Sequence, residues 1–265
     1  MSRLRLCTVV SGSSANCTYV EIDGCGLLVD AGAGIRRTEA LLNSVGASLS
    51  NVKGIFITHE HVDHISGLKT ILKKYRIPVL ATPSTLEEVA RLCPTVDPDL
   101  FCSLPRGGSA KNGVFCVTSF PCMHDAVDCS GYVIEGNGVR VGIATDLGVV
   151  SPKVLESLQG CEALVFESNH DVDMLRNGPY PYSLKQRIFG ECGHLSNQQC
   201  AEALAQLIPT GVRKVYLAHL SKENNTESLC LCTVKNYLRR AGIDPEEAVS
   251  VSVAPRSECS EVFEL

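Results

Sequence analysis

The chain has 265 residues, of which 45% are hydrophobic and 20% charged, and its formal net charge is −5. These values are typical of a soluble globular protein. No stretch approaches the roughly 20 apolar residues of a membrane span, and no apolar segment follows the opening Met1–Arg5 as in a secretion signal, so we expect a cytoplasmic protein. The acidic balance argues against a broad basic face for non-specific nucleic-acid binding, but it leaves a nucleic acid open as a substrate.

The first third of the chain alternates short apolar runs with amphipathic stretches. The Asp23-Gly24 dipeptide is a favourable two-residue turn and predicts a hairpin between the second and third strands. Pro83, directly after Thr82, is typical of the first turn of a helix. We expect strands at 4–10, 18–22, 26–29, 54–57 and 78–81, and helices at 36–45, from 68 onward, and at 82–91.

The remaining two thirds continue this alternation after an interruption. Residues 93–113 contain three prolines and three glycines and are expected to be mostly loop, and so is the Gly/Pro/Tyr-rich stretch 177–182 that precedes a basic segment. Asn137-Gly138 predicts a second hairpin, and Ser196 is an expected helix N-cap. We expect strands at 114–120, 131–134, 139–144, 163–167, 214–218 and 249–253, and helices at 151–158, 197–207 and 227–241. Sheets covered by helices on their outer faces, in one domain over residues 1–265, are the α/β architecture that this order predicts.

One short segment concentrates the chemistry. Residues 58–64 hold three histidines and two carboxylates and directly follow a run that reads as a buried strand. Imidazole and carboxylate groups are good ligands for zinc and similar divalent ions, and a loop between rigid elements can direct several of them inward. The alternative is a polar turn that happens to be rich in histidine. Because the segment holds three of only seven histidines in the chain, we favour a metal site.

Three further groups of ligand type stand at the ends of expected strands. His124 follows the strand at 114–120, Asp146 the strand at 139–144, and His219 the strand at 214–218. A single histidine in such a place is more often a hydrogen-bonded structural residue. Three acid or imidazole groups that each end an apolar strand indicate ligands that meet where the loops converge.

Taken in order, these residues resemble the five-motif signature of the metallo-β-lactamase superfamily, from residue 1 to about residue 222, and Asp30 matches its first motif. The resemblance implies a four-layer αβ/βα sandwich whose ligands meet at one edge of two facing sheets. It further implies two metal ions that Asp146 bridges. Asp30 would contact the metal ligands rather than the ions themselves. One ion would be held by His59, His61 and His124, and the other by Asp63, His64 and His219.

Two divalent ions about 3.5–4 Å apart can hold a bridging hydroxide as the nucleophile and stabilise the charge of the transition state. Asp63 can orient that nucleophile while it binds metal, so we expect a metal-dependent hydrolase. The residue types suit zinc or manganese, and iron as well, and do not select among them. Fourteen cysteines without a Cys-x-x-Cys pair are expected to be free thiols, although Cys122 and Cys192, each two residues before a histidine, leave a thiolate ligand open.

The type of hydrolase is indicated by residues 124–132, which are similar to ribonuclease Z and related phosphodiesterases and lack the His-Thr-Pro-Gly-His stretch of thioester hydrolases. By the same resemblance, Glu167 would orient His194, and His194 would give a proton to the leaving oxygen as a general acid. The alternative for His194 is a structural hydrogen bond at the start of a helix. The chain resembles the YycJ/WalJ branch still more closely, and that branch is associated with metal-dependent 5′-to-3′ DNA exonuclease activity. This likeness rests on residues 11–16, 167–171, 193–197 and 219–225. Ala15 departs from the glycine common there.

Several polar residues in these segments suit a phosphate, because hydroxyls, a helix start and cations can all bind its oxygens. For His170, the seventh histidine, both a role on the substrate side and a structural role stay open. The candidate substrate residues are Ser13, Ser14, Asn16, Arg187, Ser196, Asn197 and Lys222.

We therefore expect a phosphodiesterase that acts on DNA ends. Only 73 positions separate Asp146 from His219, which leaves no room for the large inserted domain of β-CASP nucleases, and no long basic insert resembles the tRNA-gripping arm of ribonuclease Z. One alternative is a small-molecule hydrolase for a cyclic phosphodiester or a thioester. Another is a catalytically silent metal-binding or regulatory protein, which the complete ligand set disfavours.

Overall fold

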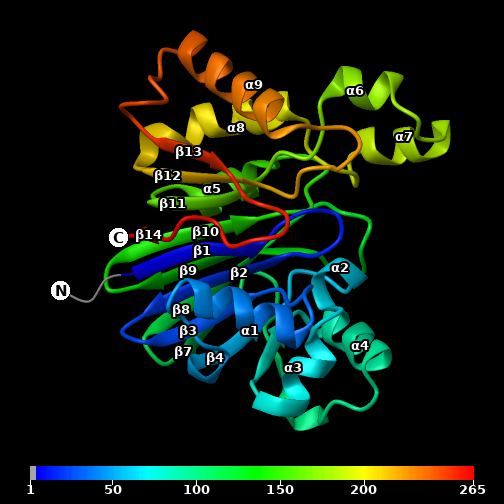
Figure 1. Cartoon of the computed structure of the whole chain (residues 1–265), viewed down its shortest axis with the longest axis vertical. Helices are drawn as coiled ribbons and strands as arrows, with labels where there is room; N and C mark the ends of the chain where they lie inside the picture. The colour runs from blue at the N-terminus through cyan, green and yellow to red at the C-terminus, as the bar shows by residue number, and fades with distance from the viewer. Residues whose placement is uncertain (1–3) are drawn as a thin grey trace.

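Two seven-stranded sheets lie face to face in the computed structural model, which describes residues 4–265, and helices cover their outer faces (Figure 1). Residues 1–3, at the start of the segment considered above for a secretion signal, lie outside the described residues. Within residues 4–265, no helix combines the length and the apolar character needed to cross a bilayer. The four layers are those of the predicted αβ/βα sandwich.

The first sheet is built mainly from the N-terminal half of the chain, in the order β14-β1-β2-β3-β4-β5-β6. Its hairpin turns at Asp23-Gly24, as predicted, and β3 to β6 run parallel. The strands are β1 (Leu4–Val10), β2 (Cys17–Ile22), β3 (Cys25–Val29), β4 (Val52–Phe56), β5 (Val79–Ala81), β6 (Phe101–Ser103) and β14 (Phe263–Glu264). The helices of this half are α1 (Ile35–Ser44), α2 (Val62–Ile65), α3 (Leu68–Tyr75) and α4 (Pro83–Leu92).

The second sheet has the order β13-β12-β11-β10-β9-β8-β7, with β10 to β13 parallel. The predicted cap of α8 is present as a capping box between Ser196 and Gln199. The strands are β7 (Ser109–Asn112), β8 (Phe115–Pro121), β9 (Ser130–Gly136), β10 (Val139–Ala144), β11 (Ala163–Glu167), β12 (Lys214–Ala218) and β13 (Ser250–Val253). The helices are α5 (Pro152–Leu158), α6 (Val172–Asn177), α7 (Tyr182–Phe189), α8 (Asn197–Leu207) and α9 (Glu227–Arg240).

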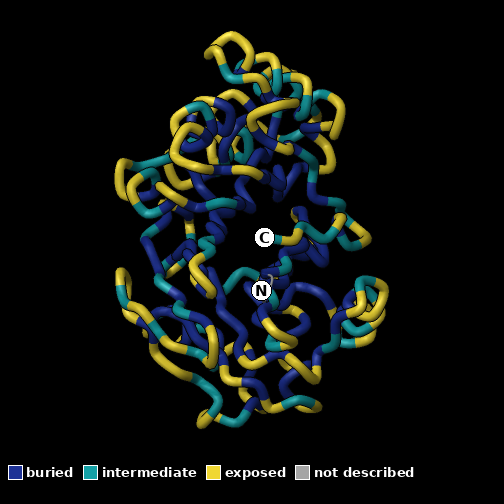
Figure 2. Tube along the Cα trace, turned by 90° about the vertical axis from the view of Figure 1, so that its left-hand side faces the viewer, coloured by how far each residue is buried: buried dark blue, intermediate teal, exposed yellow. Residues whose placement is uncertain are grey.

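The central core lies between the sheets and is closed by large side chains from both. Phe56 of the first sheet packs edge-on against Tyr132 of the second, with ring centroids 5.5 Å apart, and Tyr216 and Val165 are buried beside them. Figure 2 shows the buried residues mainly in the interior of the trace and the exposed ones mainly at its periphery. Each such buried side chain contributes roughly 1.5–3 kcal/mol, and the sheets are thereby fixed relative to each other.

Besides the unpredicted two-residue strand β14 and four-residue helix α2, two longer parts of the chain differ from the sequence prediction. The expected loop 93–113 contains β6 and β7, which are outer strands of three and four residues with mostly exposed side chains, so no apolar alternation marked them. The stretch around 177–182 is a short connection between two unpredicted helices, α6 and α7. Because α7 has no buried residue, it lacks the apolar stripe by which a helix is recognised in a sequence.

Candidate metal centre

The carboxyl ends of parallel strands from both sheets meet at one edge, and a polar residue follows several of them. Asp30 follows β3, Asp146 follows β10 after Thr145, and His219 follows β12. All three have left-handed backbone conformations, with φ of 64°, 61° and 57°. A non-glycine residue held there costs on the order of 1–3 kcal/mol and is found mainly at functional sites.

Residues 58–64 form the loop that leaves β4 and begins α2. Asn16 N donates to the Asp63 carbonyl at 2.8 Å, and Gly32 N donates to the Asn16 carbonyl at 2.9 Å, so three loops are joined by backbone hydrogen bonds. A Cβ atom at Gly32 would lie 1.8 Å from the Asp63 carbonyl oxygen, so only glycine allows this approach.

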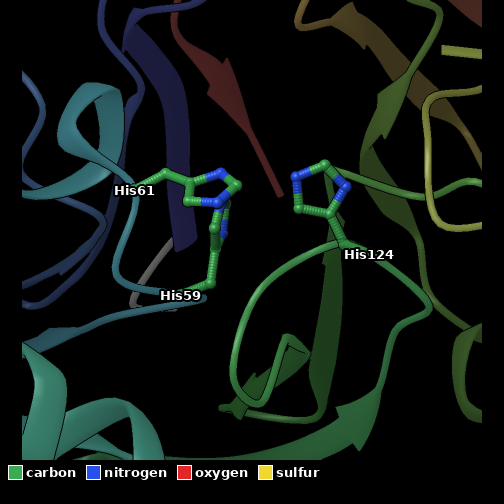
Figure 3. A group of neighbouring side chains, drawn as sticks. All are labelled: His59, His61 and His124. Carbon is green, nitrogen blue, oxygen red and sulfur yellow. The ribbon is translucent and has the colours of Figure 1, made fainter. Parts of the chain in front are cut away.

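One group of ligand-type side chains consists of His59, His61 and His124 (Figure 3). Their nearest ring nitrogens lie within 4.8 Å of one another, and the His124 imidazole faces the other two from the loop after β8. The ring centroids of His59 and His61 are 4.5 Å apart, and each lies 5.1 Å from that of His124. Three imidazoles from two loops thus surround one point.

A second group consists of Asp63, His64 and His219, again with ligand atoms within 4.8 Å of one another. Asp146 lies between the groups. One of its oxygens is 3.1 Å from His64 Nε2, and the other is 3.7 Å from His124 Nε2 and 3.4 Å from His219 Nδ1. A single carboxylate therefore faces residues of both groups.

Several buried polar atoms at this centre have no hydrogen-bond partner among residues 4–265. They include His59 Nε2, His219 Nε2 and an oxygen of Asp146. An unsatisfied buried donor or acceptor costs about 1–3 kcal/mol, so such atoms seldom gather without a ligand. Imidazole nitrogen and carboxylate oxygen are the donor atoms that zinc, manganese and iron accept. The side chains therefore fit divalent metal ions.

The outer nitrogens of the histidines are held by other side chains. His64 Nδ1 lies 2.7 Å from Asp30, whose carboxylate also accepts hydrogen bonds from the Thr58 backbone and hydroxyl at 2.9 Å and 3.0 Å. The same hydroxyl lies 3.0 Å from His59 Nδ1, and His124 Nδ1 lies 3.0 Å from the Gly193 carbonyl oxygen. Such contacts fix ring orientation and leave the Nε2 atoms for a metal.

Burial and charge set the protonation states of these groups. Burial, followed by the nearby His64, holds the pKa of His59 well below its ordinary value, so this ring is neutral and its Nε2 lone pair is available. Burial acts to raise the pKa of Asp146, but His219 and His64 outweigh it and hold that pKa well below the ordinary value. A neutral imidazole and an ionised carboxylate are the forms that bind a cation.

Glu167 and His194 stand beside the second group. Glu167 Oε1 lies 2.7 Å from His194 Nδ1 and 3.1 Å from His219 Nδ1, while its other oxygen accepts a hydrogen bond of 2.6 Å from Leu147 N. The His194 side chain is 20% exposed, in contrast to the fully buried Glu167. With Nδ1 engaged, His194 keeps Nε2 for a group that arrives from outside.

The predicted substrate residues separate into two sets. Ser13 and Arg187 line a cavity of about 150 Å³ that reaches His194, where Arg187 Nε donates to Asp125. Ser14 and Lys222 are exposed, and each directly follows a residue that lines this cavity, Ser13 or Ser221. These four remain accessible to a substrate.

The other three point into the protein. Asn16 Nδ2 lies 3.1 Å from Asp63 Oδ2 and 3.0 Å from His64 Nε2, and its side-chain oxygen accepts from Gly12 N. Ser196 is used in the cap of α8, and Asn197 hydrogen-bonds with Ser168 and Asn225. The polar side-chain groups of these residues already form hydrogen bonds inside the fold. At a helix start that packs against a neighbouring loop, no donor remains for a substrate. Asn16 thus contacts two of the expected ligands, and the side chains of Ser196 and Asn197 contact neighbouring parts of the fold.

Sequence reasoning did not single out some residues that position the centre. Ser11 Oγ accepts from His219 N at 2.8 Å, and Asn169 Nδ2 donates to the His219 carbonyl at 2.8 Å. Both lie in segments 11–16 and 167–171 that carried the resemblance, which was the available signal. The fourteen cysteines are free thiols, and among the described residues none joins a ligand group, Cys122 being buried and Cys192 exposed.

Comparison with known proteins adds sequence and fold relationships. Residues 26–220 match the family described as the β-lactamase superfamily domain. The chain is 38% identical over 248 residues to the exodeoxyribonuclease YycJ of Bacillus anthracis, which covers 94% of each protein. It is 35% identical over 237 residues to the exodeoxyribonuclease WalJ of Streptococcus pneumoniae serotype 2, covering 89% of this chain and 88% of WalJ. The crystal structure of the metallo-β-lactamase fold protein YhfI from Bacillus subtilis superposes with a TM-score of 0.74 at 14% identity over the full length of both chains.

Proposed function

The chain belongs to the β-lactamase superfamily and is a metal-dependent hydrolase, and we propose that it removes nucleotides from DNA ends in the 5′-to-3′ direction at two divalent ions. One observation carries this proposal: the Asp146 carboxylate lies between two groups of three potential ligands. In the proposed assignment, His59, His61 and His124 bind one ion and Asp63, His64 and His219 the other. Asp146 bridges the two ions.

The choice of DNA follows from the relatives. YycJ and WalJ are both named exodeoxyribonucleases, and each aligns with nearly nine tenths of this chain or more. The proposed substrate is therefore a phosphodiester bond near the end of a DNA strand. The exposed Ser13 and Ser14, the Arg187 guanidinium in the cavity at His194, and Lys222 supply donors for its phosphate oxygens.

When bound, two divalent ions lower the pKa of water toward about 7 and stabilise the charge that develops on the phosphate. Asp63, which is 23% exposed and contacts Asn16 at 3.1 Å, is placed to accept a hydrogen bond from the attacking water while it binds metal. As the water oxygen bonds to phosphorus, it releases one proton to solvent, and the bond from phosphorus to the leaving oxygen breaks. His194, oriented by Glu167 through Nδ1, gives the leaving oxygen a proton from Nε2.

Degradation of a labelled duplex tests the proposal. A blunt duplex with a 5′-phosphate and separate labels at its 5′ and 3′ ends is incubated with the protein and Mn²⁺. We expect the 5′ label to leave first as a mononucleotide and the 3′-labelled strand to shorten progressively. The Asp146→Ala variant, prepared in the same way, controls for a contaminating nuclease.

Two outcomes would contradict the proposal. Loss of the 3′ label first would reverse the direction. Absence of cleavage of any DNA or RNA, together with hydrolysis of bis(p-nitrophenyl) phosphate, would favour a small-molecule phosphodiesterase. Elemental analysis of the same sample measures the proposed two ions per chain and identifies them.

A further inference from the structure

Exposed apolar side chains are unevenly placed on this protein. Among the described residues, seven large apolar side chains are exposed, and the two aromatic ones, Tyr182 at 77% and Phe189 at 40%, are the first and last residues of α7. Three more, Val62, Met123 and Val127, lie on the loops that carry His61 and His124. Exposed apolar side chains that gather in one region mark a binding site more often than ones scattered singly, and the two exposed rings stand on a single helix.

Helix α7 presents two different faces. Tyr182, Lys185, Gln186 and Phe189 follow the spacing i, i+3, i+4, i+7 and line a groove of about 400 Å³ together with Arg176 of α6. Leu184, Arg187 and Ile188 lie on the other side and line the 150 Å³ cavity that contains His194. The helix thus separates an outer groove from the cavity at the metal centre.

The net charge of residues 174–190 is opposite in sign to that of the whole chain. Residues 174–190 contain Arg176, Lys185 and Arg187 and no acidic residue, although the chain has a net charge of −5. Among residues 4–265, the one carboxylate that the Arg176 guanidinium contacts is the exposed one of Asp173, at 3.1 Å. Exposed ion pairs of this kind contribute about 0–1 kcal/mol, so the guanidinium can exchange that partner for a phosphate.

The groove is preformed. Pro179 and Pro181 stiffen the connection between α6 and α7, and Lys185 Nζ donates to the Arg176 carbonyl at 2.8 Å. Phe189 packs edge-on against the buried His170, with ring centroids 5.4 Å apart. Tyr182, in contrast, is almost free of contacts and presents its ring to solvent.

We propose that the groove between α6 and α7 binds an unpaired stretch of a DNA strand, with a base stacked on Tyr182 and backbone phosphates bound by Arg176 and Lys185. Rings exposed beside cations are the common means of binding single strands, since every base has a face that can stack. This inference rests on the proposed function, because the opposite side of α7 lines the cavity at His194, where the strand would be cleaved. It predicts that strand ends must open before they are cleaved.

Binding to a fluorescein-labelled single strand tests the inference. The metal-loaded protein is titrated with an oligonucleotide whose end linkages are phosphorothioates, which slows cleavage, and anisotropy gives Kd. We expect Tyr182→Ala to weaken binding roughly 5- to 160-fold, the range for loss of one stacked base, and Tyr182→Trp to restore it. Leu92→Ala, which removes another exposed apolar side chain, on α4, is the matched control and should bind as the wild type does.

The salt dependence of DNA binding distinguishes contacts to individual phosphates from a general electrostatic attraction. Arg176→Gln should reduce the slope of log K against log salt by about 0.7, the value for one contact to a single strand. Lys111→Gln, which removes an exposed charge on β7, should leave the slope unchanged. Equal slopes for the two variants would remove Arg176 from the contacts.

The outcomes distinguish this inference from the function on which it rests. If the wild type degrades DNA and Tyr182→Ala binds the single strand with an unchanged Kd, the groove is overturned while the nuclease proposal stands. If Tyr182→Ala weakens binding to a duplex with cross-linked ends as much as to a single strand, stacking on an unpaired base is wrong. If the wild type hydrolyses bis(p-nitrophenyl) phosphate and neither binds nor cleaves DNA, both proposals fall.

Discussion

The metal centre and the α6–α7 segment lie next to each other and are built in opposite ways. At the metal centre (residues 58–64 with His124, Asp146 and His219), six of the ten side chains are buried, and several of their outer atoms are held by partners such as Asp30, Thr58 and Glu167. In the α6–α7 segment (residues 172–189), Leu175 is the one buried residue.

This difference follows from what each region does in our proposals. A ligand displaced by a fraction of an ångström loses its metal, so the centre needs rigid strand ends and fixed rings. A surface that holds a flexible strand needs accessible rings and cations, and it can be built on a lightly packed helix. Substitutions in the first region should therefore change metal content and turnover, and those in the second should change DNA affinity alone.

The largest expected effect is that of Asp146→Ala. Because Asp146 is proposed to bridge both ions, its loss should weaken metal binding by more than the 10- to 100-fold typical of residues that only support ligands. Turnover should fall with metal content, and elemental analysis together with duplex degradation measures both. Asp99→Ala removes an exposed carboxylate far from the centre and should retain full metal. Two retained ions at a normal rate would remove the bridging assignment.

His194→Ala should separate proton transfer from metal binding. Since His194 is proposed to protonate the leaving oxygen, we expect both metals to remain and DNA cleavage to fall about 10²- to 10⁴-fold. A p-nitrophenolate leaving group needs no proton, so hydrolysis of bis(p-nitrophenyl) phosphate should fall much less. Loss of a metal ion would instead make His194 a ligand, because its ring lies in one group with Asp146, Glu167 and His219.

The same contrast explains what could be predicted from the sequence. The longer strands and the hairpins were predicted because buried segments carry apolar runs, and the residues of the centre were found because they cluster or follow such runs. The four-layer fold was implied by the family resemblance. Their roles as ligands and the extent of the domain over residues 1–265 stay predictions.

The parts that escaped prediction lack an apolar pattern or depend on contacts between distant segments. Helix α7 buries no residue, and β6 and β7 are short outer strands, so periodicity could not reveal them. Whether a serine or asparagine faces a substrate or the interior depends on which loop lies against it. Asn197, for example, is buried by contacts with Ser168 and Asn225, which lie 29 and 28 residues away.

Asn16 and Asn197 offer a matched pair of buried amides, one at the metal centre and one outside it. Asn16→Ala removes contacts to Asp63 and His64 and should lower metal affinity about 10- to 100-fold. Asn197→Ala leaves buried partners unpaired and should lower the free energy of unfolding by about 1–3 kcal/mol with unchanged metal affinity. Competition with a chelator and urea denaturation measure the two effects. Similar metal losses in both variants would mean that Asn16 has no special relation to the ligands.

An effect that is seen only at low pH is expected at His170, where the buried interior meets α7. Burial lowers the pKa of His170 to about 4, and neither ring nitrogen has a hydrogen-bond partner among the described residues. The unfolded chain, with an ordinary pKa near 6.5, binds the proton more readily, so stability is lost as pH falls from about 6.5 toward 4. At pH 5 this amounts to about 2 kcal/mol. His170→Leu cannot take up the proton, so its free energy of unfolding, measured in urea at pH 7 and pH 5, should fall by about 2 kcal/mol less than that of the wild type. Between pH 7.5 and 9 the two proteins should change in parallel. An equal loss at pH 5 would mean that His170 takes up its proton in the folded protein as well, and Phe189 would then pack against a charged ring rather than a neutral one.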